Sequence, residues 1–88
     1  MRFFVYIIYS SILDRYYVGY TRNPQERLVK HNLGATNYTR RGKPWELVYV
    51  EEFSSRAEAI LRENQIKRMK SRKYIESLIA EKGKALNS

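Results

Sequence analysis

The apolar positions at the start of the chain predict a two-stranded hairpin. Residues 3–9 are apolar on both alternating sets of side chains, which indicates a strand that is covered on both faces. Residues 16–21 are rich in strand-forming residues and predict a second strand. Between the two, Ser10, Ser11 and Asp14 are typical of a polar turn, so the two strands are expected to pair as a hairpin.

The middle of the chain predicts a helix, a loop and a third strand. Asn23 can cap a helix, and Pro24 suits the first helical position. Gly34 marks a natural end for this helix. Residues 35–44 are polar and basic and predict a loop, whereas the large apolar residues of 45–53 predict a strand.

Two further helices are predicted in the last third of the chain. Ser55 and Glu58 form a capping-box pattern, which begins a helix that extends to about Lys70. Ser71 caps a last helix with a clear apolar face, and Gly83 is expected to end it.

The predicted order is therefore β-β-α-β-α-α, an α/β (α+β) chain with a small, mostly antiparallel three-stranded sheet and helices packed on it. We expect one domain over residues 1–83 and a frayed tail over 84–88. The 88 residues include no cysteine, which excludes disulfides and thiolate zinc sites and fits a reducing cytoplasm. No segment approaches the roughly 18 apolar residues that a membrane span needs, so we expect a cytoplasmic protein without a membrane partner.

The charge pattern points to a polyanion partner. The net charge is +8, from 17 lysines and arginines against 9 acids. Residues 62–73 hold six of the basic residues against Glu63 alone, and a second cluster comprises Arg40, Arg41 and Lys43. Such clusters suit the phosphates of a nucleic acid, but a basic surface that serves only solubility fits the charge equally well.

Two tyrosines on the predicted hairpin are candidate functional residues. Tyr6 and Tyr17 lie eleven positions apart, and Tyr17 shares its strand face with Gly19 and Thr21. This set predicts a shallow notch lined by hydroxyl groups, and a glycine in a strand often marks close approach to the backbone. Each tyrosine alone is better explained as a core residue, because aromatic side chains favour strands.

Three residues on the predicted helices extend this set. Arg27 and His31 are four positions apart and therefore share a helix face, which suits phosphate binding and proton transfer or is simply a solvated stripe. Glu63 can form a helix salt bridge to Lys67 or act as a ligand to Mg²⁺. Position alone favours the salt bridge.

Taken together, these residues resemble the GIY-YIG nuclease family. Phe4-Val5-Tyr6 stands where that family has its GIY triplet, and Tyr17-Val18-Gly19 stands in the place of YIG. The order and spacing of Arg27, His31 and Glu63 also match. The resemblance covers residues 3–79, and the segments around Thr39 and Trp45 are similar to the short, stand-alone bacterial branch.

The resemblance implies a metal-dependent endonuclease that hydrolyses phosphodiester bonds in DNA with one Mg²⁺ ion. It implies that Tyr6 accepts a proton from the attacking water, assisted by Tyr17 and His31. Glu63 would hold the metal, and Arg27 would offset charge on the phosphate oxygens. A free tyrosine has a pKa near 10, so we expect Arg27 and the metal to favour its ionised form.

The basic residues outside this set are candidate contacts to the nucleic-acid backbone. They are Arg40, Arg41, Lys43, Lys67, Arg68 and Lys70. Backbone contacts carry no sequence information, and no base-reading element is evident, so we expect recognition of nucleic-acid structure. DNA fits the resemblance better than RNA, a protein partner is one way to supply targeting, and a monomer is expected.

The sequence departs from the family pattern at two places. Phe4 replaces the glycine of the first triplet, and the late asparagine of many members is missing from Tyr74-Ile75-Glu76. The alternative is therefore a nucleic-acid-binding module with weak or no cleavage activity. A third interpretation is an interaction domain whose basic face meets an acidic protein.

Overall fold

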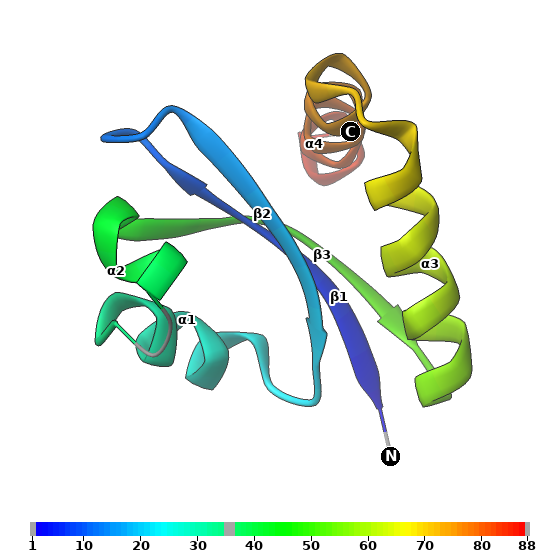
Figure 1. Cartoon of the computed structure of the whole chain (residues 1–88). Helices are drawn as coiled ribbons and strands as arrows, with labels where there is room; N and C mark the ends of the chain where they lie inside the picture. Colours follow the sequence, from blue (N-terminus) through cyan, green and yellow to red (C-terminus); the bar gives the residue numbers. More distant parts are fainter. Residues whose placement is uncertain (1, 35–36, 88) are drawn as a thin grey trace.

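The three strands form one antiparallel sheet between two pairs of helices (Figure 1). The protein is described here by a computed structural model, which describes residues 2–34 and 37–87. The sheet has the order β2-β1-β3. In chain order the elements are β1 (Phe3–Ser10), β2 (Arg15–Thr21), α1 (Pro24–Asn32), α2 (Asn37–Gly42), β3 (Trp45–Phe53), α3 (Arg56–Met69) and α4 (Arg72–Asn87). The fold class is confirmed, as is the predicted order of elements apart from the added helix α2.

The central strand β1 explains why its sequence is apolar on both alternating sets. Val5 and Ile7 are fully buried on one face, in the same apolar cluster as residues of α3 and α4. Tyr6 and Ile8 are buried on the other face, in a cluster that includes Leu28 of α1. Because helices cover both faces, most side chains of the strand are buried, and only Phe4 and Tyr9 are half-buried.

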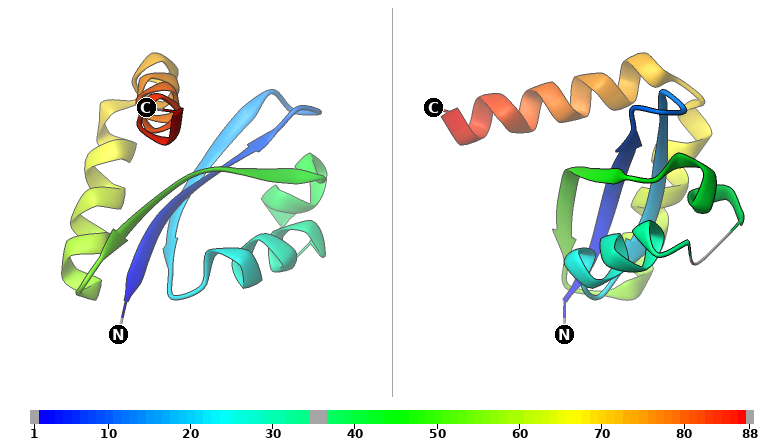
Figure 2. Two further views of the ribbon diagram at one scale, coloured as in Figure 1. Left: turned by 180° about the vertical axis from the view of Figure 1, so that it is seen from behind. Right: turned by 90° about the vertical axis from the view of Figure 1, so that its left-hand side faces the viewer.

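The predicted helix caps are present. The side chain of Asn23 accepts a hydrogen bond from the Glu26 amide at 3.0 Å, and α1 begins at Pro24. Gly34 follows the end of α1 with a left-handed φ of 80°, which glycine adopts without strain. The side chain of Ser55 caps α3 in the same way. Figure 2 shows that α4 projects beyond the sheet. In the described ranges, every helix is too short or too polar to cross a bilayer.

The short helix α2 lies where the sequence predicts a loop over 35–44. Its packing explains the difference, because the Trp45 indole donates a hydrogen bond of 2.7 Å to the Thr39 carbonyl. Thr39 and Gly42 are buried, and a side chain at Gly42 would lie 2.5 Å from the Trp45 ring. Tertiary contacts therefore favour a helix that local sequence does not predict. The side chain of Tyr38 and residues 35–36 lie outside the described part.

One other prediction differs from the structure, and the pairing of β3 adds a feature that was not predicted. Gly83 does not end the last helix, because α4 continues to Asn87; a glycine inside a helix costs only about 1 kcal/mol. The pairing of β1 with β3 contains an irregularity, in which Ile7 lies opposite Tyr49 and Ile8 opposite Leu47. This extra residue turns Leu47 and Tyr49 to opposite faces of the sheet, although they are two positions apart.

Candidate active site

A buried hydrogen bond joins the first strand to the first helix. The hydroxyl of Tyr6 lies 2.9 Å from Nε2 of His31, and both residues are buried. His31 is therefore not part of a solvated helix stripe. Its other ring nitrogen, Nδ1, is buried with no hydrogen-bond partner among the described residues. Tyr6 is a core residue, as the alternative supposed, and its hydroxyl is hydrogen-bonded to His31.

Gly19 makes room for the phenol of Tyr6. The two residues are opposite each other in the hairpin. A β-carbon at Gly19 would lie 2.6 Å from the Tyr6 hydroxyl oxygen, closer than packing allows. The predicted open notch is therefore wrong, because the Tyr6 ring fills that space. Thr21 also has a local role, since its hydroxyl accepts a hydrogen bond of 3.2 Å from the Asn23 amide at the turn into α1.

Tyr17 completes an aromatic group around this hydrogen bond. The centre of its ring lies 6.4 Å from that of Tyr6 and 5.0 Å from that of His31. On another side it contacts Trp45, at 6.4 Å between ring centres. Tyr17 is half-buried, whereas Tyr6 and His31 are buried. Tyr17 is therefore the member of this aromatic group that a ligand could contact first.

The pKa of Tyr6 is raised in this environment. Burial is the main cause, and the nearby Tyr17 and Glu63 act in the same direction. A hydrogen bond and the charge of Arg27 oppose the rise, so Arg27 lies within reach of the phenol. Arg27 alone therefore does not favour the Tyr6 phenolate, because burial outweighs it, and the expectation that Arg27 and a bound metal together favour the phenolate stays a prediction. Burial and Arg27 also lower the pKa of His31, which is neutral at pH 7.

Glu63 lies close enough to this group for its charge to act on Tyr6. Only 13% of its side chain is exposed, and the Lys67 ammonium donates to it at 3.1 Å. The salt bridge that the sequence offered is confirmed. Arg27 and Glu63 both act on the pKa of Tyr6, although they come from helices on opposite faces of the sheet.

The fit of a metal ion to this site rests on one carboxylate. Within residues 2–34 and 37–87, no three histidine, aspartate or glutamate side chains form a group that could hold a metal. Mg²⁺ often takes one or two carboxylates and completes its shell with water and phosphate oxygens. Glu63 is an oxygen donor of this kind beside the tyrosines, so the site fits an ion that substrate helps to hold.

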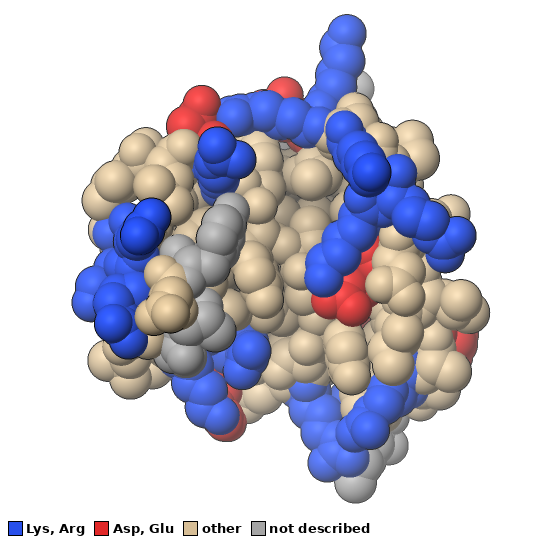
Figure 3. Space-filling model, in the orientation of Figure 1, with Lys and Arg blue, Asp and Glu red and all other residues tan. Residues whose placement is uncertain are grey.

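Basic side chains border this part of the molecule. Figure 3 shows lysine and arginine on both sides of a hollowed, uncharged surface, with acidic atoms beside basic ones at one border. Arg40, Arg41 and Lys43 are exposed on and after α2. Lys67 and Lys70 line one pocket, whereas Arg68 lines another together with Phe53 and Met69. Arg68 therefore lines a different pocket from Lys67 and Lys70.

A supporting residue escaped the sequence analysis. Asn32, the last residue of α1, accepts a hydrogen bond of 2.6 Å from the Trp45 amide. Its side-chain amide donates in turn to the Trp45 carbonyl at 3.2 Å. These bonds fix the end of α1 that carries His31 against β3. No local pattern marks such a pairing across 13 residues.

Comparison with known proteins agrees with this arrangement. The family model of the GIY-YIG catalytic domain matches residues 2–75. A UPF0213 protein of Natronomonas pharaonis is 39% identical over 79 residues, covering 89% of this chain and 91% of that protein. A UPF0213 protein of Staphylococcus haemolyticus is 43% identical over 65 residues, covering 73% and 78%.

A solved structure shares the fold. The solution NMR structure of a UPF0213 protein from Bacillus halodurans is 36% identical, with a TM-score of 0.61, and covers 94% of this chain and 87% of that one. The family model and these relatives span most of the residues that build the site. This chain therefore belongs to the GIY-YIG family of nuclease domains.

Proposed function

We propose that this protein is a magnesium-dependent endonuclease that hydrolyses phosphodiester bonds in DNA and recognises the structure of its substrate. The observation that carries the proposal is the meeting of Tyr6, Tyr17, Arg27, His31 and Glu63, which come from four different elements. A core needs none of their polar groups. Phenols, an imidazole, a guanidinium and a carboxylate in one place suit proton transfer beside a phosphate.

In the proposed mechanism, Tyr6 takes a proton from the attacking water while its own proton passes to Nε2 of His31. The 2.9 Å hydrogen bond provides this path, and the lowered pKa of His31 keeps the imidazole free to accept. This route does not require a phenolate before substrate binds, which agrees with the raised pKa of Tyr6. Tyr17 and Arg27, which are half-buried, would contact the phosphate.

Glu63 would hold the metal ion in this proposal. A bound Mg²⁺ supplies positive charge next to the phosphate and the leaving oxygen. Without metal, Glu63 is paired with Lys67. To bind the metal, its carboxylate would have to release the Lys67 ammonium. The released ammonium of Lys67 would then be available to a phosphate of the substrate.

The proposed contacts to the DNA backbone are exposed basic residues on both sides of the site. They are Arg40, Arg41, Lys43, Lys67 and Lys70. They set affinity and salt dependence but do not read bases, which supports recognition of structure. We propose that the protein acts as a monomer and that a protein partner supplies further targeting.

A cleavage assay tests the proposal. Nicked and branched DNA are incubated with Mg²⁺ and either the wild-type protein, the Glu63→Gln variant or a Glu52→Gln control. Glu52 is an exposed acid on β3, paired with Arg2 at 3.5 Å. We expect Glu63→Gln to reduce the cleavage rate about 1,000-fold, since metal-held charge contributes several kcal/mol. Binding should change by less than about twofold, and Glu52→Gln should cleave normally.

A binding module without cleavage is the second candidate. The observation in its favour is the Glu63–Lys67 ion pair, which already satisfies the carboxylate without a metal. Binding of DNA by the wild-type protein, with no cleavage of any substrate in Mg²⁺ or Mn²⁺, would refute the endonuclease and support this module.

A further inference from the structure

A second concave surface lies beside the candidate active site. It is formed by the β1–β2 hairpin, the edge strand β2 and the junction of α3 with α4, and we call it the hairpin groove. Its volume is about 700 Å³. Pockets of roughly 300–1,000 Å³ hold ligands of nucleotide size or larger. The hairpin groove is thus large enough for part of a nucleic-acid strand.

The rim of the hairpin groove is basic. Arg15, Lys67 and Lys70 line it and are exposed. Lys67 is paired with Glu63, but Arg15 and Lys70 form no ion pair with residues 2–34 or 37–87. Two cations on one rim are therefore available to an anionic ligand.

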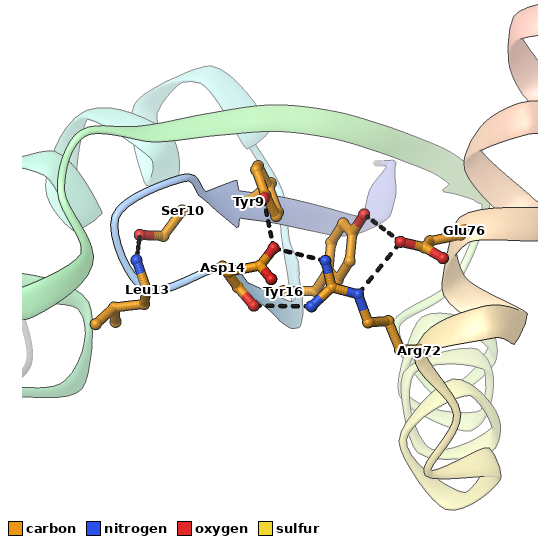
Figure 4. A network of polar contacts seen from close by, with 7 residues as sticks. All are labelled: Tyr9, Ser10, Leu13, Asp14, Tyr16, Arg72 and Glu76. Carbon is orange, nitrogen blue, oxygen red and sulfur yellow. Dashed lines mark hydrogen bonds and ion pairs between the residues drawn. The ribbon is translucent and has the colours of Figure 1, made fainter.

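The acid that lines the groove, Asp14, is held in an ion pair. Figure 4 shows the Arg72 guanidinium between Asp14 and Glu76. It donates to the Asp14 carboxylate at 2.6 Å and to the Asp14 carbonyl at 2.9 Å. Tyr9 donates to the same carboxylate at 2.6 Å, and these bonds hold Asp14 at a left-handed φ of 52°. Arg72 offsets only part of the acidic charge, because it is shared between Asp14 and Glu76, and the network fixes the hairpin loop to α4.

The hairpin groove is continuous with the candidate active site. Tyr17 lines the groove and also contacts His31, with 5.0 Å between ring centres. Lys67 lines the groove and binds Glu63. A strand whose phosphate lay at Tyr17 and Glu63 would therefore enter the groove with its neighbouring nucleotides.

We propose that the hairpin groove binds unpaired nucleotides of the substrate strand next to the phosphate that is cleaved. This inference rests on the proposed function. The floor of the groove is apolar and includes Val18, Ile66 and Ile75. A duplex keeps its bases stacked inside and offers only sugar and phosphate to such a surface, whereas an unpaired strand brings base faces to it. The groove therefore favours flaps, loops or single strands over continuous duplex.

Fluorescence anisotropy with the whole chain tests this binding separately from cleavage. The probes are a labelled single-stranded oligothymidine, an abasic strand of equal length and a duplex of equal length, all in EDTA. The variant Arg15→Ser/Lys70→Ser removes both available cations. Its control, Arg2→Ser/Arg56→Ser, removes the same charge beside Phe3, at the other end of β1. Circular dichroism melts check that both variants fold.

We expect the wild-type protein to bind oligothymidine more tightly than the abasic strand or the duplex. The groove variant should bind it about tenfold more weakly, and the slope of log affinity against log salt should fall by about 1.4, the value for two phosphate contacts on a single strand. The control should change affinity by less than about twofold. Equal losses of affinity for oligothymidine in the groove variant and its control would overturn the inference. Equal affinity of the wild-type protein for oligothymidine and the abasic strand would do the same.

Failure of this inference and failure of the proposed function give different results. Cleavage of DNA by the groove variant with wild-type affinity refutes the groove and leaves the nuclease in place. Groove-dependent binding without cleavage refutes the nuclease and leaves the groove. Displacement of the oligonucleotide by polyglutamate at equal charge concentration would assign the groove to an acidic protein partner and overturn the inference.

Discussion

The two faces of the sheet differ in what they bury. The face toward α3 and α4 holds an apolar cluster with Val5, Ile7 and Ile66 at its centre. The face toward α1 and α2 holds Tyr6 and His31, joined by a hydrogen bond, beside Trp45 and the buried Thr39. On the α3/α4 face the buried Tyr49 hydroxyl is bonded to Glu51 and the other buried side chains are apolar, whereas the α1/α2 face buries a phenol and an imidazole that are bonded to each other.

This difference assigns distinct tasks to the two layers. Burying apolar surface stabilises a fold at about 25 cal/mol per Å², whereas a buried polar group without a partner is destabilising. The unpartnered Nδ1 of His31 is such a group among the described residues. We infer that packing on the α3/α4 face supplies most of the stability of the fold. Burying reactive polar groups on the α1/α2 face costs part of that stability.

Truncation of a buried side chain on the apolar α3/α4 face should have the greatest effect on stability. Ile66 is 1% exposed on α3. Ile66→Ala should lower the free energy of unfolding by about 3 kcal/mol, because it removes buried methyl groups and leaves a cavity. In a domain of this size that corresponds to a fall in Tm of about 12–24 °C. Thermal and urea unfolding measure it.

Leu61 provides the control on the same helix. It is 65% exposed, so Leu61→Ala should change stability by less than about 0.5 kcal/mol. A loss below about 1 kcal/mol for Ile66→Ala would contradict the assignment of stability to this face.

Gly19→Ala should have the next greatest effect on stability, and it acts on the α1/α2 face, where Tyr6 and His31 are buried. The new methyl group would lie 2.6 Å from the Tyr6 hydroxyl oxygen and 2.8 Å from the ring carbon that bears it. Overpacking of this kind costs about 1–3 kcal/mol, and here it also shifts the phenol away from His31. We therefore expect lower stability together with lower cleavage, measured by urea unfolding and by cleavage rate.

A double-mutant cycle tests whether the clash with Tyr6 is the cause. Tyr6→Phe removes the oxygen that lies closest to the new methyl group. The double variant should therefore be more stable than the sum of the single effects by about 0.5–1 kcal/mol. Strict additivity would show that Gly19→Ala acts through the backbone of β2 instead.

The parts of the fold that sequence predicts well are those governed by local rules. The caps at Asn23 and Ser55 and the apolar run of β1 need only neighbouring residues to act. Helix α2 depends on Thr39 and Gly42 packing against Trp45, which no local pattern shows. The irregular pairing of β3 likewise comes from the partner strand.

In the candidate site too, local sequence predicts some features, and others depend on tertiary contacts. Family resemblance brings Tyr6, His31 and Glu63 together as a set, but spacing alone favoured a core tyrosine and a salt bridge and left a solvated stripe open for His31. The burial of His31 and the fit of Tyr6 over Gly19 arise only when β1, β2 and α1 are assembled. The raised pKa of Tyr6 could not be predicted for the same reason, because burial is its main cause.

The smallest expected effect is the pH dependence of stability, which arises from the α1/α2 face alone. His31 is the one histidine in the chain, and burial and Arg27 lower its pKa. Below about pH 6.5 the unfolded chain takes up a proton that the folded protein resists. Stability should therefore be full above that pH and fall as the pH decreases, by at most about 1.4 kcal/mol per pH unit. Urea unfolding between pH 7.5 and 5.5 measures it.

Two variants separate the layers in this experiment. His31→Asn should remove the slope, because no other side chain of this chain has an ordinary pKa between pH 5.5 and 7.5. Ile66→Ala should lower stability equally at every pH and keep the slope, since its loss involves no proton. Survival of the slope in His31→Asn would show that the slope does not come from His31. Stability that rose as the pH fell would instead mean that the imidazole is charged beside Tyr6, and a charged imidazole could not accept the proton that the proposed mechanism passes to it.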